Sequence, residues 1–179
     1  MIRGEKTVLR PVDLGDVDRL TKWLNDPEVT RHLSFYLPVA RRAEEAWVKN
    51  DQPGHTRFAI ETVDGKHIGN CGLHGVADKH RCWGFGIFIG DKDYWDGGYG
   101  TDAVISALTY GFAHQNLHRI HLTVDADNLR ARRCYEKAGF MQEGVLREHH
   151  HDRGRYLDIV QMGVLRAEFE EKHAERIVS

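Results

Sequence analysis

Three glycines surround a tyrosine in the stretch YWDGGYGTDAV, which runs from Tyr94 to Val104. The stretch lies between an apolar run, FGIFIG, and a segment with the pattern of a helix, TDAVISALTYGF. Glycines at such a position usually mean that the backbone itself must approach a ligand. The first N–H groups of a helix have no partner inside the helix and carry the positive end of its dipole, which favours a phosphate. The glycine loop therefore predicts a phosphate-bearing ligand.

The glycine loop has two other interpretations. Gly98, Gly100 and Ala103 match the dinucleotide-binding pattern G-x-G-x-x-A, and Asp125 follows at about the distance expected of that fold's acidic residue. In the dinucleotide fold, however, the glycine turn follows its strand almost at once, whereas DKDYWD separates Ile89 from the glycines here. Too little chain follows Asp125 for the remaining elements of that fold. The second alternative is that the glycines only form a tight bend.

A second pattern is the segment NLRARRCYEKAGF, from Asn128 to Phe140. Asn128 can begin a short helix, and Gly139 can end it as a left-handed cap. Asn128 and Tyr135 are two helical turns apart and therefore lie on one face. The residues that share this side are small enough to let the helix approach a sheet: Ala131, Cys134 and Ala138.

Together the two patterns resemble the GNAT superfamily of N-acetyltransferases. Asn128 to Phe140 is similar to the signature N-x-x-A-x-x-x-Y-x-K-x-G-F, and Trp95 to Thr101 is similar to the loop Q/R-x-x-G-x-G/A, although Trp95 replaces the usual Gln or Arg. Three further stretches resemble the branch that acetylates the N-terminal alanines of ribosomal proteins, with its spermidine-modifying and antibiotic-modifying relatives. They are LRP near the start, WLNDPEV from Trp23 to Val29, and YLDIVQMGVL near the end.

The resemblance implies that acetyl-CoA is the cosubstrate and that the glycine loop holds its pyrophosphate. Its pantetheine is then expected beside the strand that ends at Ile89, pairing with the backbone like an added strand. The basic stripe Arg130, Arg133 and Lys137 could meet the 3′-phosphate, or could be only a solvated face. The cofactor-binding residues expected on this basis are Ile87, Phe88, Ile89, Trp95, Asp96, Gly97, Gly98, Tyr99, Gly100, Thr101, Asn128 and Arg133.

The expected reaction is direct attack of an amine on the thioester. An N–H near Phe88 or Ile89 would polarise the carbonyl. Tyr135 would protonate the leaving thiolate as the catalytic residue. No covalent enzyme intermediate is needed, so Cys134 is expected to pack rather than to act as a nucleophile.

The general base is the point at which the sequence departs from many members of the superfamily. They often carry a glutamate early in the strand before the glycine loop, but Cys82 to Gly86 reads CWGFG and offers no carboxylate. An N-terminal α-amine, with a pKa near ~7.7–8.0, is neutral far more often at pH 7 than a lysine amine near ~10.4. A site without a strong base is therefore better matched to a protein N-terminal amine, or works through a water held by polar groups, for which Asp125, His149 and Asp158 are equal candidates. The expected partner is an amine-bearing small molecule or a protein N-terminus. The alternatives are a polyamine or an aminoglycoside as acceptor, or an acetyl-CoA sensor without catalysis.

The run HHHD, from His149 to Asp152, raises the question of a metal. His149 and His151 would share one face of a strand and could begin a site. A third ligand at the usual spacing is missing from the sequence, so no metal is expected.

The pattern of the whole chain predicts one acetyltransferase domain, residues 1–179, of mixed α+β class. A GNAT fold is expected, with a mostly antiparallel sheet of about seven strands, a central parallel strand–helix–strand unit, and flanking helices. Helices are expected from Asp13, with Leu14, Val17, Leu20 and Leu24 on one face, and over 41–50, 101–115 and 128–138. The strands are expected around 6–11, 57–62, 66–73, 81–90, 119–125, 144–150 and 155–165.

Composition narrows the function classes. The net charge is −2, so no basic field argues for nucleic acid or an anionic membrane. Three cysteines without a C-x-x-C motif indicate a reducing compartment, and no apolar run reaches the ~18 residues of a transmembrane helix. The N-terminus lacks the pattern of a signal peptide. A cytoplasmic enzyme that could form a homodimer is therefore expected.

Overall fold

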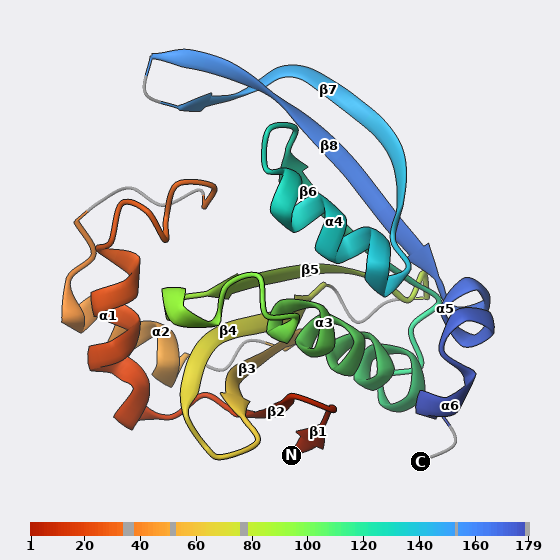
Figure 1. Ribbon diagram of the computed structural model, residues 1–179, viewed down its shortest axis with the longest axis horizontal. Coiled ribbons are helices and arrows are strands. Elements are labelled where there is room, and N and C mark those ends of the chain that lie inside the picture. Colours follow the sequence, from red (N-terminus) through yellow and green to blue (C-terminus); the bar gives the residue numbers. More distant parts are fainter. Residues whose placement is uncertain (34–37, 51–52, 76–78, 153, 178–179) are drawn as a thin grey trace.

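The computed structural model describes residues 1–33, 38–50, 53–75, 79–152 and 154–177. Strands and helices are interspersed along the chain, and the strands form one sheet in the order β1-β2-β3-β4-β5-β6-β8-β7 (Figure 1). The strands are β1 (Ile2–Arg3), β2 (Thr7–Pro11), β3 (His55–Thr62), β4 (His67–His74), β5 (Cys82–Ile89), β6 (Arg119–Asp125), β7 (Met141–Asp152) and β8 (Arg155–Leu165). The helices are α1 (Val17–Leu24), α2 (Arg41–Lys49), α3 (Tyr99–Thr109), α4 (Leu129–Ala138), α5 (Arg166–Lys172) and α6 (Ala174–Ile177), with short 3₁₀ turns at Leu14–Asp16 and Lys92–Tyr94 and a π turn at Tyr110–His114.

The sheet confirms the mixed α+β class and the central parallel unit. β5 and β6 run parallel and are joined through α3, whereas the other neighbouring strands pair antiparallel. The sheet has eight strands rather than about seven. The extra strand is β1, which has two residues and pairs with β2. So short a strand has no periodicity that a sequence pattern could reveal.

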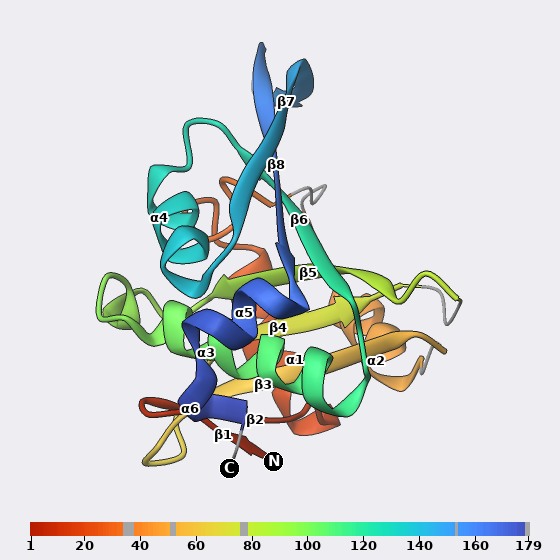
Figure 2. The same cartoon turned by 90° about the vertical axis from the view of Figure 1, so that its right-hand side faces the viewer.

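β5 and β6 stay together over a short distance only. Their pairing joins Cys82–Gly84 to Arg119–His121. Beyond this point β5 remains paired with β4 as far as Ile89, and β6 remains paired with β8 as far as Asp125. Figure 2 shows the two strands diverging, with the β7–β8 hairpin following β6 away from the rest of the sheet. The sheet therefore opens in its middle.

The predicted apolar faces form the core. Ile120, Leu122 and Val124 of β6 are all buried, as their alternation predicts. Val104, Ala107 and Leu108 of α3 are fully buried against β2, β4 and β5. In the first helical segment Val17, Leu20 and Leu24 are buried, but Leu14 is half exposed because it lies in the 3₁₀ turn that precedes α1. Within the described residues, no helix is both long and apolar enough to span a bilayer.

α4 has both of the predicted caps. The side chain of Asn128 accepts a hydrogen bond from the Ala131 N–H at 3.1 Å. Gly139 has φ +114, and the N–H groups of Gly139 and Phe140 both reach the Tyr135 carbonyl at 3.0 Å. These caps fix the length of α4 and direct the chain back into β7.

Asp102, in the first turn of α3, holds the N-terminal segment. Its carboxylate accepts hydrogen bonds from the backbone N–H groups of Glu5, Lys6 and Thr7 at 2.9–3.0 Å and from the Thr7 hydroxyl at 2.6 Å. Burial by itself would raise the pKa of Asp102, but these hydrogen bonds outweigh burial and lower it. The carboxylate thereby joins the start of α3 to the start of β2.

We expect Asp102→Asn to lower the free energy of unfolding at pH 7 by about 2–3 kcal/mol, because an amide cannot accept all of these bonds and leaves buried donors unpaired. A carboxyl group with a lowered pKa in the folded state stabilises the protein above its unfolded pKa, and this stability is lost as pH falls through the folded pKa. The difference in free energy of unfolding between wild type and Asp102→Asn should therefore become smaller as the pH is lowered. Denaturant titrations from pH 7 to pH 3 measure it, with the exposed Glu171→Gln as control. An equal gap at every pH would contradict the role of the carboxylate charge.

Candidate active site

A cavity of about 570 Å³ lies where β5 and β6 diverge. Five segments surround it: the end of β5, the glycine loop and start of α3, the end of β6, α4 with its N-cap, and residues 28–33 after α1. Eleven residues predicted from the sequence to be functional line it: Ile87, Phe88, Ile89, Trp95, Asp96, Gly98, Gly100, Thr101, Asn128, Arg133 and Tyr135.

Two of the predicted loop residues, Gly97 and Tyr99, do not line this cavity. The Gly97 carbonyl faces the other way and accepts a hydrogen bond from Lys6 Nζ at 2.8 Å. The Tyr99 ring packs edge-on against Tyr94, at 5.0 Å between centroids, and lies 5.6 Å from Lys6 Nζ. These residues shape and anchor the loop from outside.

The glycine loop delivers the start of α3 to the cavity. The N-cap residue is Gly98, with φ +82, a left-handed conformation that glycine adopts readily. Gly98 has no side chain with which to cap the helix, and the first intrahelical bond that it accepts is from Asp102 N–H. The N–H groups of the first turn are therefore available to an anion, as the sequence predicts.

One edge of β5 faces the opening. Successive residues of a strand direct their N–H and C=O groups to opposite sides. The Phe88 carbonyl points to β4: its oxygen lies so near Gly69 that a Cβ added there would be only 2.3 Å away. The Gly90 N–H also points to β4, where it donates to the Ile68 carbonyl. The polar backbone groups of Ile87 and Ile89 therefore face the cavity. This corrects the expectation for Phe88: its side chain lines the cavity, but its N–H faces β4.

Trp95, which stands where Gln or Arg is usual, closes one side of the cavity. Its indole N–H donates to the Ile89 carbonyl at 2.8 Å, and the Arg130 guanidinium stacks 3.9 Å above its ring. Arg130, Arg133 and Lys137 all line the cavity, so the predicted basic stripe faces this space. A phosphate-bearing ligand would thus meet both helix N–H groups and cationic side chains.

Tyr135 lies on the inner face of α4 and is only 7% exposed. Its ring packs against Phe140 with 5.8 Å between centroids, while the residue still lines the cavity. Burial raises the pKa of the phenol, so the hydroxyl remains protonated and can donate a proton across the whole neutral range. Burial likewise raises the pKa of the neighbouring Cys134, which keeps it a thiol that packs against Thr101.

The three side chains proposed to hold a water do not line the cavity. His149 is exposed, and Asp158 accepts the Glu148 N–H at 2.8 Å. Asp125 is buried behind the cavity wall. Two titratable side chains of the segment after α1 line the cavity although the sequence did not single them out, Glu28 and His32.

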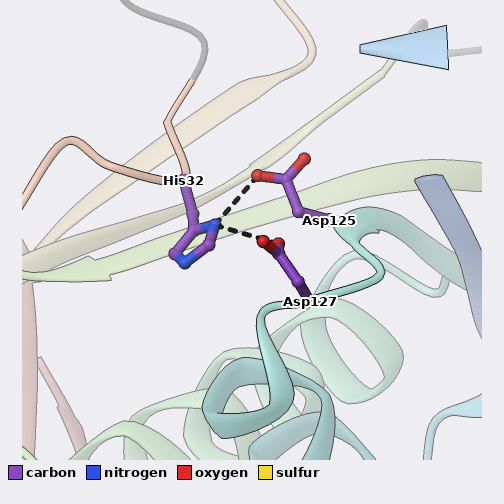
Figure 3. Close-up of side chains that lie close together, drawn as sticks. All are labelled: His32, Asp125 and Asp127. Atoms are coloured by element: carbon purple, nitrogen blue, oxygen red, sulfur yellow. Dashed lines mark hydrogen bonds and ion pairs between the residues drawn. The ribbon is translucent and has the colours of Figure 1, made fainter. Parts of the chain in front are cut away.

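Figure 3 shows how His32 meets Asp125 and Asp127. His32 Nδ1 lies 3.0 Å from Asp125 Oδ2 and 3.8 Å from Asp127 Oδ1. The other Asp125 oxygen bonds His150 Nδ1 at 2.8 Å. More than 90 residues separate His32 from Asp125 in the chain, so no local motif could have revealed this contact.

The group of potential metal ligands in the structure is not the one considered from the run His149 to Asp152. A bulge between Leu146 and His150 changes the register of β7, and it is His150 that turns toward Asp125. Among the described residues, His32, Asp125 and Asp127 form a group whose potential ligand atoms lie within 4.8 Å of one another. These atoms already bond each other, and His149 and His151 are not part of the group.

Comparison with known proteins supports the resemblance seen in the sequence. The acetyltransferase (GNAT) domain model matches residues 6–141. The spermidine N(1)-acetyltransferase of Vibrio cholerae is 34% identical over 169 residues, which cover 93% of this chain and 96% of that protein. The putative ribosomal N-acetyltransferase YdaF of Bacillus subtilis is 29% identical over 107 residues, covering 60% of this chain and 58% of that protein.

The fold is matched as well. A crystal structure of the Vibrio cholerae spermidine N-acetyltransferase in complex with CoA and spermine superposes with a TM-score of 0.85 at 28% identity, covering 92% of this chain and 98% of that one. The match to the family model, the similar sequences and the similar fold all indicate the same family as the glycine loop, the open edge of β5 and the buried tyrosine beside it. The chain belongs to the GNAT family of acetyltransferases, enzymes that transfer an acetyl group from acetyl-CoA to an amine.

Proposed function

We propose that this chain, as one acetyltransferase domain, acetylates a primary amine of a small polyamine. The observation that carries the proposal is the single cavity that joins the first turn of α3, the open edge of β5 and Tyr135. Full-length similarity to spermidine acetyltransferases supports the polyamine as acceptor. Negative charge at the end of the cavity formed by residues 28–33, which we call the acceptor end, also supports a polyamine. Glu28 lines the cavity there, and Asp125 and Asp127 lie behind His32. Such carboxylates favour a multiply charged cation.

Acetyl-CoA is proposed to lie across the cavity from the glycine loop to β5. The pyrophosphate would sit on the N–H groups from Gly98 to Thr101, with the loop from Trp95 shaping its seat. The pantetheine would pair with the backbone groups of Ile87 and with the Ile89 N–H, because the Ile89 carbonyl already accepts the Trp95 indole N–H. Asn128 and Arg133, on the facing surface of α4, would contact the same arm of the cofactor.

The chemistry then follows from placing the thioester beside Tyr135. The amine nitrogen attacks the carbonyl carbon, and an N–H of Ile87 or Ile89 stabilises the oxyanion. The C–S bond breaks, the Tyr135 hydroxyl gives its proton to the leaving sulfur, and the amine loses a proton to solvent or a base. The products are the N-acetylated amine and CoA, and the tyrosine recovers its proton from solvent.

Tyr135→Phe should lower kcat by about 10²–10⁴-fold, the usual scale for loss of a general acid. Affinity for CoA should change little, because phenylalanine keeps the packing against Phe140. Steady-state kinetics and calorimetry measure the two quantities, with the exposed Tyr156→Phe as control. If the Tyr135 variant turns over as the wild type does while chemistry limits the rate, the tyrosine only packs.

Gly100→Val should weaken CoA binding at least tenfold, or about 1.4 kcal/mol. A Cβ at this position meets Cys134 Sγ at 3.6 Å and Ile89 Cγ1 at 3.9 Å, which the fold accommodates, but the added methyls occupy space at the phosphate seat. Gly144→Val, in β7 and outside the cavity, is the matched control. If calorimetry finds equal CoA affinity for Gly100→Val and wild type, the glycine loop does not bind the pyrophosphate.

The acceptor can be identified from free-thiol release with a panel of amines. Spermidine and spermine should show kcat/KM values at least about tenfold above those of an aminoglycoside or a peptide, or about 1.4 kcal/mol. The panel includes a peptide with a free α-amine and the same peptide with that amine blocked and a lysine exposed. A preference for the free α-amine would identify a protein N-terminus as the acceptor instead. CoA binding without thiol release for any amine would identify a sensor.

A further inference from the structure

We propose that His32 accepts the proton of the acceptor amine, and that Asp125 is the positioning residue that holds its ring. This inference rests on the proposed acetyl transfer in the same cavity, and supplies the base that is missing from β5. Asp125 and Asp127 come from the end of β6 and the turn before α4, and His32 comes from the segment after α1 (Figure 3).

The carboxylate of Asp125 sets the tautomer of the histidine. Its side chain is 3% exposed, and an ionised carboxylate can only accept hydrogen bonds. The ring nitrogen that faces it, His32 Nδ1, must therefore carry the hydrogen. In the neutral ring this leaves Nε2 with a free lone pair, and Figure 3 shows Nε2 pointing away from both carboxylates. The same logic orients the base in Ser-His-Asp triads.

His150 provides an internal comparison. It bonds the same carboxylate through its own Nδ1, at 2.8 Å against 3.0 Å for His32. His32 lines the cavity, whereas His150 does not. Both rings are held in the same manner, so any difference in their effect on the reaction reports access to the acceptor rather than the bond to Asp125.

The proposed proton path balances with the reaction. As the amine nitrogen forms its bond to the carbonyl carbon it becomes an ammonium centre, and His32 Nε2 takes one of its protons. The C–S bond breaks, and Tyr135 protonates the sulfur. The resulting imidazolium, stabilised by Asp125, returns its proton to solvent, and Tyr135 is reprotonated. Imidazole is the side chain best matched to this exchange near neutral pH.

Among the described residues, the charged groups around the His32 ring are the following. Asp125 and Asp127 face His32 from β6 and the turn before α4, and His150 reaches Asp125 from β7. Arg155 of β8 bonds Asp127 at 3.0 Å and offsets its charge. Glu28, on the same segment as His32, lines the cavity and pairs with Lys92 Nζ at 2.8 Å, which offsets its charge.

The test is the pH dependence of spermidine acetylation in wild type, His32→Gln and His150→Gln. His32→Gln should lower kcat by about 10²-fold without changing CoA affinity. In a plot of log kcat/KM against pH, the acid limb of the wild type should have a slope of about two, because the base and the amine must both lose a proton. The acid limb of His32→Gln should have a slope of about one, because only the amine must lose a proton. His150→Gln should keep the wild-type slope. Asp125→Asn should lower kcat and bring the slope toward that of His32→Gln, a change that a loss of stability alone would not produce.

Chemical rescue gives an independent measurement. Added imidazole should restore turnover to His32→Ala but not to Tyr135→Phe, because only the first variant lacks a proton acceptor. The proposal is overturned if His32→Gln keeps the wild-type slope, or if His150→Gln loses it equally. It is also overturned if wild-type turnover is abolished by a chelator and restored by Zn²⁺ or Mn²⁺, which would make His32, Asp125 and Asp127 metal ligands. A wild type that binds CoA but releases no thiol with spermidine would instead refute the proposed function.

Discussion

The separation of β5 from β6 is the constraint on which the rest of the molecule depends. Only Cys82–Gly84 pair with Arg119–His121, and from there each strand keeps a partner on one side alone. A sheet normally satisfies its backbone groups internally, and an interior edge left open must be filled by water or by a ligand. An extended molecule with amide groups can complete that edge. The pantetheine arm has this chemistry, which is why we propose the opening as the seat of the acetyl donor.

Small residues allow the two helices beside the opening to serve the same ligand. Gly100 at the start of α3 and Cys134 of α4 come so close that an added Cβ would touch the sulfur at 3.6 Å. The anion-binding end of one helix is thereby set beside the tyrosine of the other. Asp102 holds that end through the backbone of residues 5–7, and Lys6 reaches the loop carbonyl of Gly97. The position of the loop therefore depends on the N-terminal segment as well as on the sheet.

Most of the fold could be predicted from local patterns, because these patterns record which side of an element is buried. The alternation in β6, the apolar face of α3 and the caps of α4 all agree with the structure. Leu14 and β1 could not be predicted, since a single turn and a two-residue strand have no period. The glycine loop and Tyr135 could be predicted as site residues because they lie in short contiguous motifs, and Gly98, Gly100 and Tyr135 line the cavity. His32 could not be predicted because what marks it is its contact with Asp125, a residue brought to it only by the fold.

The indole of Trp95 has an optical consequence. It lies at the wall of the cavity, bonds the Ile89 carbonyl and is covered by the Arg130 guanidinium. A cationic group stacked on an indole alters its emission, and a phosphate that drew Arg130 toward itself would change that stacking. Of the other tryptophans, Trp23 and Trp83 are buried, and Trp47 is exposed on α2 under the Arg57 guanidinium; none of the three lines the cavity. The replacement of the usual Gln or Arg by tryptophan thus places a fluorophore at the edge of the proposed cofactor site, and its share of the emission can be isolated by comparison with Trp95→Phe.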